Sequence, residues 1–120
     1  MQFIRVSLLA AAAALLSTAA MAAQAPQGDA VRGKAAFESY GCYACHGYQG
    51  QGAGTGVKLA PGPRAWGAFS TFVRTTSAEM PPYTEKVLPT PALADIHAYL
   101  ASIPASPNPA SIPLLQQIGN

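Results

Sequence analysis

The spacing of apolar side chains indicates one helix clearly, near the end of the chain. From Pro91 to Ser102 the apolar positions recur every three or four residues, which places them on one face of a helix. This stripe consists of Leu93, Ile96, Tyr99, Leu100 and Ile103. Thr90 is the expected N-cap, and Pro91 suits the first turn because its missing N–H has no partner there to lose. We therefore predict a helix over Pro91–Ser102 with one buried face.

A second helix is expected over Gly28–Tyr40. Asp29 is a plausible N-cap, and Gly41 is a plausible residue to end the helix in a left-handed conformation. Gly33 and Phe37 are four positions apart and therefore share one face. A glycine on a buried face allows another helix to approach closely.

A third helix is expected over Ala65–Thr75. Its apolar residues follow the i, i+3 and i+7 spacing of a helix that is buried on one side. They are Trp66, Phe69, Phe72 and Val73. The predicted helix therefore contributes an aromatic face to the core.

The remaining segments predict loops. Repeated glycines exclude stable regular structure from Gly47 to Gly62, and a loop of this length is unusual unless it has a function, such as wrapping the edge of a cofactor. Met80-Pro81-Pro82-Tyr83 cannot lie inside a helix. The stretch Pro104–Pro113 is rich in Pro, Ala and Ser and is expected to be extended or disordered. No strand pattern follows residue 22, so the predicted fold class is all-α, with helices joined by long loops.

The first residues of the chain resemble a secretory signal peptide. Arg5 is followed by an apolar run from Val6 to Leu16 and then by the small-residue pattern Ala20-Met21-Ala22. These features predict cleavage near residue 22, although an uncleaved membrane anchor is the alternative. The expected organisation is a signal peptide over 1–22, a domain over 23–103 and a Pro-rich tail over 104–120. The expected location is the periplasm.

Charge and size narrow the classes of function. After residue 22 the chain carries six basic and five acidic side chains, with no basic run. This balance gives no indication of nucleic-acid binding and predicts weak long-range electrostatic steering. A domain of roughly 100 residues buries a limited fraction of its surface and often needs a further stabilising element, such as a disulfide or a bound metal. A covalently held cofactor can supply that stabilisation.

The stretch Cys42-Tyr43-Ala44-Cys45-His46 carries the strongest chemical signal, and it contains the only two cysteines of the chain. Two cysteines three positions apart and a histidine directly after them have the spacing by which c-type haem is attached. The two thiols add to the vinyl groups of the porphyrin, and the histidine ligates the iron. The alternatives are a disulfide, a thioredoxin-like redox pair and a zinc site. The last two lack their usual βαβ setting and paired ligand spacing.

With this motif in its setting, the chain over Gly28–Ser102 resembles a class I c-type cytochrome. The resemblance depends on the order of a glycine–phenylalanine first helix, an early haem-attachment motif, a glycine-rich loop, a late Met-Pro and a closing helix with an aromatic residue. It implies a small fold of three to five helices and long loops wrapped around one covalent haem c. It also implies that Phe37 and Tyr99 pair where the first and last helices cross.

The resemblance implies a set of site residues as well. Met80 would be the second axial ligand opposite His46. The alternatives are that Met80 only fills the core, or that His97, expected on the flank of the last helix, is the ligand. The family's Gly-Pro-x-Leu segment corresponds to Gly56-Val57-Lys58-Leu59, so the carbonyl of Val57 is the expected acceptor for the other His46 N–H. Arg64 and Trp66 are candidates for contact with haem propionates, the alternative being a solvated arginine and a core tryptophan.

A haem with both axial positions filled by the protein implies a one-electron carrier rather than an enzyme. The expected partners are redox proteins, with a dehydrogenase as donor and an oxidase or another cytochrome as acceptor. An open-site haem protein that binds gas or reduces peroxide is the alternative. The carrier could also be the cytochrome subunit of a periplasmic dehydrogenase, because the tail ends in apolar residues at Ile112, Leu114, Leu115 and Ile118.

Overall fold

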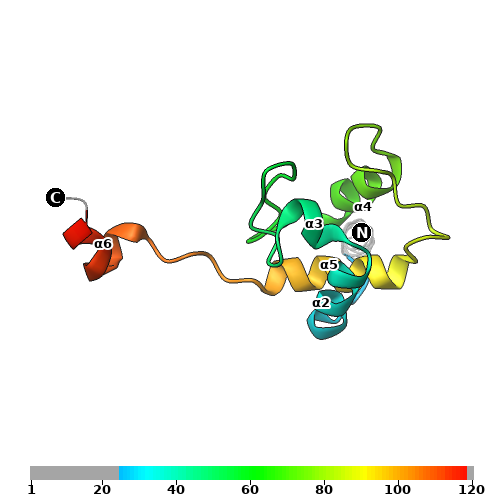
Figure 1. Cartoon of the computed structure of the whole chain (residues 1–120). Coiled ribbons are helices and arrows are strands. Elements are labelled where there is room, and N and C mark those ends of the chain that lie inside the picture. Colours follow the sequence, from blue (N-terminus) through cyan, green and yellow to red (C-terminus); the bar gives the residue numbers. More distant parts are fainter. Residues whose placement is uncertain (1–24, 119–120) are drawn as a thin grey trace, which may run out of the picture.

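Helices and connecting loops make up residues 25–118, which are the residues that the computed structural model describes (Figure 1). Within this range no strand is found, so the all-α prediction is confirmed. The helices are α2 (Ala30–Ser39), α3 (Cys42–His46), α4 (Trp66–Thr75), α5 (Thr90–Ser102) and α6 (Pro113–Ile118), with a short 3₁₀ helix, η2 (Pro109–Ser111). None of the described helices is long and apolar enough to span a bilayer. The predicted signal peptide lies outside the described residues.

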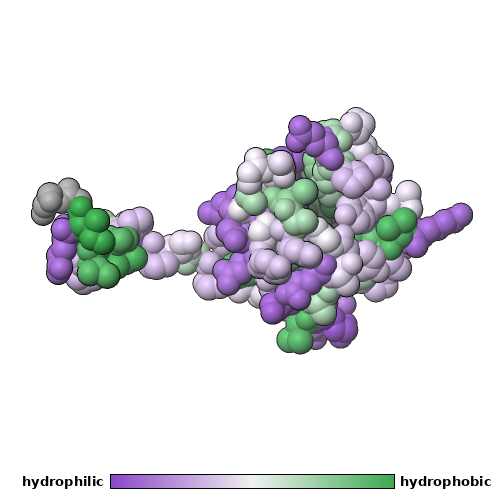
Figure 2. All heavy atoms as spheres, in the orientation of Figure 1, coloured by the Kyte–Doolittle hydropathy of each residue, from purple (hydrophilic) through white to green (hydrophobic). Residues whose placement is uncertain are grey.

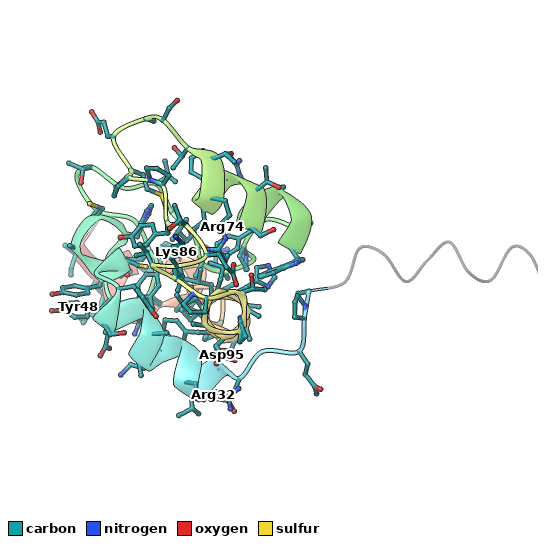
Figure 3. All side chains as sticks on the ribbon, turned by 90° about the vertical axis from the view of Figure 1, so that its right-hand side faces the viewer. Arg32, Tyr48, Arg74, Lys86 and Asp95 are labelled. Atoms are coloured by element: carbon teal, nitrogen blue, oxygen red, sulfur yellow. The ribbon has the colours of Figure 1, made fainter. Side chains whose placement is uncertain are left out.

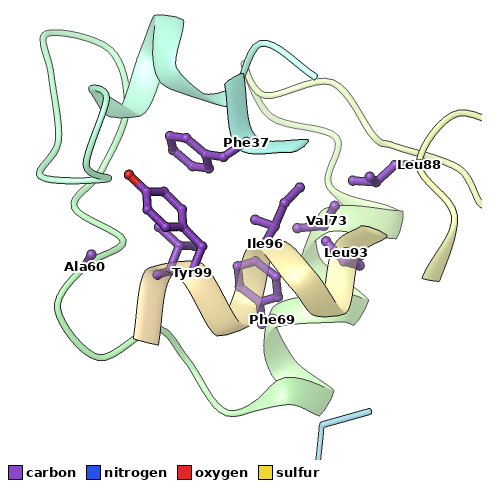
Figure 4. Packing of buried hydrophobic residues seen from close by; sticks show 9 residues of the cluster. Phe37, Ala60, Phe69, Val73, Leu88, Leu93, Ile96 and Tyr99 are labelled. Carbon is purple, nitrogen blue, oxygen red and sulfur yellow. The ribbon is translucent and has the colours of Figure 1, made fainter. Parts of the chain in front are cut away.

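The crossing of α2 and α5 forms the centre of the body, as the sequence predicts. Phe37 and Tyr99 are both buried, and their ring centroids lie 5.7 Å apart at an interplanar angle of 57° (Figure 4). A Cβ atom at Gly33 would collide with the carbonyl of Asp95 and with the side chain of Tyr99. The absence of a side chain at Gly33 therefore lets the two helices approach closely.

The ends of α2 follow the predicted capping pattern. The Asp29 side chain accepts a hydrogen bond from the Arg32 N–H at 2.8 Å, and Gly41 has the left-handed φ of 76° that ends the helix. Both of these predictions are confirmed. The polypeptide then turns directly into α3, which begins at Cys42.

The start of α5 differs from its prediction. Pro91 lies in the first turn as expected, but Thr90 is already helical and does not act as the N-cap. Its N–H donates to Glu85 Oε1 at 2.8 Å, and its hydroxyl donates to Glu85 Oε2 at 2.7 Å. A carboxylate from the preceding turn therefore satisfies the free backbone donor, so the threonine hydroxyl is not needed for that role.

The tail is more regular than predicted. Residues 104–108 are extended and lead away from the body, but η2 and α6 follow (Figure 1). The Asn108 side chain accepts from the Ala110 N–H at 2.9 Å and so caps the 3₁₀ turn inside the stretch predicted to be extended. Apolar side chains gather on the surface of α6, where Leu114, Leu115 and Ile118 are exposed (Figure 2).

Candidate functional site

A cavity of about 580 Å³ lies within the body of the domain. Its walls are mostly apolar and come from α2, α4, α5 and the loop before α5. They include the side chains of Phe37, Phe69, Val73, Leu88, Leu93 and Ile96 (Figure 4). A cavity of this size falls in the range that binds a cofactor rather than a water molecule. The body therefore has room for a large apolar group at its centre.

The two cysteines lie on α3 and both line this cavity. Cys42 is half-buried, Cys45 is exposed, and both are free thiols rather than a disulfide. Burial raises the pKa of Cys42 to about 11, so its thiol is protonated at neutral pH. In a helix, residues three apart share a face, which brings both sulfurs to the side that meets the cavity.

His46 is the last residue of α3, and its ring is oriented by a loop residue eleven positions further along the chain. Its Nδ1 atom lies 2.8 Å from the carbonyl oxygen of Val57, which is the contact that the resemblance implies. A Cβ atom at Gly56 would collide with the carbonyl of Cys45 and crowd His46 Nδ1, so glycine at position 56 permits this approach. With Nδ1 held as the donor, Nε2 keeps its lone pair and can ligate a metal.

Valine occupies position 57, where the resemblance implies a proline, and the contact with His46 is present all the same. Only the backbone oxygen of Val57 accepts the hydrogen bond, while the residue as a whole is 71% exposed. The identity of the side chain therefore has little influence on how His46 is oriented.

Met80 reaches the same cavity from a different part of the chain. It lies on the loop between α4 and α5, is half-buried and packs against the core, and it lines the cavity together with Pro81. The fold thus brings the imidazole of His46 and the thioether of Met80 to a single cavity, although they are 34 positions apart.

The structure separates the two predicted propionate contacts. Arg64 lines the cavity, with its guanidinium carbon 5.6 Å from the centroid of the Phe72 ring. Trp66 is not among the lining residues and packs edge-on against His97, with 5.7 Å between ring centroids. Placement therefore favours the alternative reading of Trp66 as a core residue.

His97 also lies away from the cavity walls. Its Nε2 atom is 2.9 Å from the carbonyl oxygen of Arg64, and its ring packs against Phe69 with centroids 5.1 Å apart. This arrangement joins α5 to the start of α4. Because His97 does not line the cavity that His46 and Met80 share, the case for His97 as a ligand is weak.

Sequence reasoning missed Arg74, whose side chain is only 20% exposed. Its guanidinium donates hydrogen bonds to the carbonyls of Tyr83 and Leu88 and forms an ion pair with Glu85 (Figure 3). These residues belong to the loop that carries Met80. The sequence does contain a signal for this contact: Arg74 is a basic residue in the last turn of an amphipathic helix, and the long loop that follows contains the acidic Glu85.

The donor set and the cavity fit a haem. The walls are apolar, two thiols face the cavity from one side of α3, and an oriented imidazole and a soft thioether enter it from separate elements. Imidazole and thioether are a known axial pair for haem iron. In the described residues, no cluster of three or more His, Cys, Asp or Glu side chains suits another metal.

Comparison with known proteins assigns most of the described body to a protein family. Residues 28–100 match a protein-family model described as "Cytochrome C oxidase, cbb3-type, subunit III". No curated protein matches the chain, and no solved structure does. The matched region contains α2 to α5 except the last two residues of α5, and with them every residue discussed above as part of the site.

Proposed function

Since the chain belongs to the family described as cytochrome C oxidase, cbb3-type, subunit III, a family of c-type cytochrome domains, we propose that it is a periplasmic one-electron carrier. Cys42 and Cys45 would attach one haem c, and His46 and Met80 would ligate its iron. Arg64 would contact a propionate, and its place in the cavity wall supports this. Trp66 stays a weaker candidate for that contact.

One observation carries this proposal. All four attachment and ligand residues line the same apolar cavity, and the Val57 carbonyl orients the ring of His46. A disulfide or a zinc site would need neither the cavity nor Met80.

The chemistry follows from what these residues do. Haem supplies an iron that changes oxidation state by one electron. The hydrogen bond from His46 to Val57 fixes the imidazole ring, and the soft thioether of Met80 favours the reduced state. The apolar walls disfavour the extra positive charge of the oxidised state. If His46 and Met80 both ligate the iron, no position would be left for a substrate, so the proposed role is transfer and not catalysis.

The proposed partners are redox proteins: a dehydrogenase as donor, and an oxidase or another cytochrome as acceptor. The balance of charge on the chain indicates that short-range contact matters more than electrostatic steering. The proposed location is the periplasm, because of the predicted signal peptide.

A second candidate is a role as a bound subunit of a larger oxidoreductase. The observation that favours it is the tail, where α6 exposes Leu114, Leu115 and Ile118 at the end of an extended segment. The partner would be a periplasmic dehydrogenase or, in line with the description of the family model, an oxidase.

Mass analysis and absorption spectra of the matured protein test the proposal directly. We expect the added mass of one haem on a chain without free thiols, and spectra of a haem with two protein ligands in both oxidation states. Free thiols and no added mass would overturn the covalent haem. Rapid binding of carbon monoxide by the reduced protein would favour the open-site alternative.

A further inference from the structure

The loop between α4 and α5 holds Met80 with few hydrogen bonds of its own. From Ser77 to Pro82 the only one found in the described residues is donated by Ala78 N–H to the Thr76 hydroxyl, at 3.4 Å. Pro81 and Pro82 have no N–H to donate and have a fixed φ. They therefore form a stiff connection between Met80 and the next anchored residue, Tyr83.

Tyr83 is anchored from three directions. Its N–H donates to the Val73 carbonyl at 2.9 Å, and its hydroxyl donates to the Tyr40 carbonyl at 3.0 Å. Its own carbonyl accepts from Arg74 Nη1 at 2.8 Å. The position of Tyr83 thus depends on α2, on α4 and on the Arg74 guanidinium.

Arg74 extends this anchoring to the rest of the loop. Nη1 also donates to the Leu88 carbonyl at 2.6 Å, and Nη2 donates to Glu85 Oε2 at 2.8 Å and to the Thr90 hydroxyl at 3.3 Å. A single planar group therefore contacts the loop at three residues and the first residue of α5. Lysine cannot reproduce this arrangement, because an ammonium group lacks the forked, planar set of donors.

We propose that Arg74 is a positioning residue for Met80. It fixes Tyr83 and Leu88 so that the Pro81-Pro82 connection holds the thioether in the cavity. Arg74 itself does not line the cavity, and Glu85 balances its charge, so it acts through the backbone of the loop and not through its field at the metal. This inference rests on the proposed ligation by Met80.

Competition by free imidazole on the oxidised, haem-loaded protein tests the inference. Imidazole must displace Met80 to bind, so its half-saturating concentration reports how firmly the thioether is held. We expect Arg74→Lys and Arg74→Gln to lower that concentration about tenfold, equivalent to ~1.4 kcal/mol. The exposed Lys86, on the same loop (Figure 3), provides the matched control: Lys86→Gln removes a positive charge and should leave imidazole binding unchanged.

The lysine variant separates positioning from charge. If Arg74 acted only through its positive charge, Arg74→Lys would bind imidazole like the wild type, and that result would overturn the inference. The inference would also be overturned if both Arg74 variants lose thermal stability while imidazole binding is unchanged, because Arg74 would then stabilise the fold without positioning Met80.

If the Arg74 variants do not accumulate in haem-loaded form, Glu85→Gln takes their place. It should lower the half-saturating concentration by about threefold, since an exposed ion pair contributes less than a buried network.

Met80→Ala distinguishes failure of the inference from failure of the proposed function. If Met80 is the ligand, Met80→Ala binds imidazole far more tightly than the wild type, and adding Arg74→Lys to it has no further effect. If Met80→Ala binds imidazole like the wild type, the proposed ligation is wrong. If Met80→Ala has its expected effect and Arg74→Lys has none, only the positioning role is wrong.

Discussion

The guanidinium of Arg32 donates two hydrogen bonds to the carboxylate of Asp95, from Nε at 2.9 Å and from Nη2 at 3.0 Å, and so joins α2 to α5 (Figure 3). The same carboxylate accepts a third hydrogen bond, from the Asp29 N–H at 2.6 Å. The hydrogen bonds from Arg32 and from the Asp29 backbone hold the pKa of Asp95 below its ordinary value.

This pair predicts acid sensitivity of the fold. Because the pKa of Asp95 is lower in the folded state, its stabilising effect is present above the unfolded-state pKa of about 3.9 and is lost as the pH falls below that value. Asp95→Asn should lower the thermal midpoint at pH 7 and show a smaller further loss between about pH 5 and about pH 2.5. Circular dichroism melts across this pH range check both effects. Equal acid sensitivity of the two proteins would contradict the assignment.

Met80→His should lower the reduction potential. If Met80 is a ligand, replacing its thioether by a second imidazole removes the ligand that favours the reduced state, and the shift should be on the order of 0.1 V, part of the ~0.8 V range set by axial ligands. A redox titration of the haem-loaded protein measures it. An unchanged potential would refute ligation by Met80.

Gly56→Ala should disturb the orientation of His46. A methyl group at this position collides with the Cys45 carbonyl, so the loop must move away from His46, at a cost of about 1–3 kcal/mol. Val57→Pro is the matched control, because it restores the family's residue, keeps the accepting carbonyl and changes an exposed side chain. The thermal midpoint and the reduction potential should both change in Gly56→Ala. Neither should change in Val57→Pro.

Gly33→Ala should destabilise the crossing of α2 and α5. The added methyl group would overlap the backbone of Asp95, and overpacking of this kind costs about 1–3 kcal/mol. Lys34→Ala, at the next and exposed position of α2, serves as the control. Denaturant unfolding gives the free energy of unfolding of each variant. Equal values for Gly33→Ala and Lys34→Ala would show that α2 and α5 can move apart without loss of stability, which contradicts this prediction.

Truncation before Pro104 should leave the body intact. Ile103 packs against the core, whereas η2 and α6 follow an extended segment and expose most of their apolar surface. We expect a thermal midpoint within about 2 °C of the full chain, corresponding to a change well below 1 kcal/mol. Co-purification then tests the second candidate function: equal recovery of a redox partner with and without the tail would exclude docking through α6.

The parts of the fold that sequence could predict are those with local or strongly periodic signals. The helices α2 and α5 and their buried faces follow from Gly33, Phe37 and the stripe around Tyr99, and the loop from Gly47 to Gly62 follows from its glycines. That α2 and α5 cross at Phe37 and Tyr99 is what the resemblance implies. The Val57 contact was reached through the resemblance, because a backbone acceptor in an irregular loop has no signature of its own. The all-α class follows from the same signals.

The missed features depend on contacts across irregular backbone. Arg74 reaches residues 9 to 16 positions away, and no periodicity relates a helix end to carbonyls in the following loop. Asp95 lies within the apolar stripe, and its partner is on another helix. Thr90 failed as a cap because Glu85 already supplies the acceptor. For Trp66, residue type alone fits a core position and a polar contact equally well.

The central cavity has a consequence for how the protein is made. Its walls come from α2, α3, α4, α5 and two loops, so a group that fills it contacts most of the body. If the proposed prosthetic group is not acquired, Phe37, Leu88 and Leu93 face an empty space and lose packing contacts there, so the polypeptide unfolds more readily. Proteolysis would then remove chains that lack the group and spare those that contain it, so only chains with the group would accumulate.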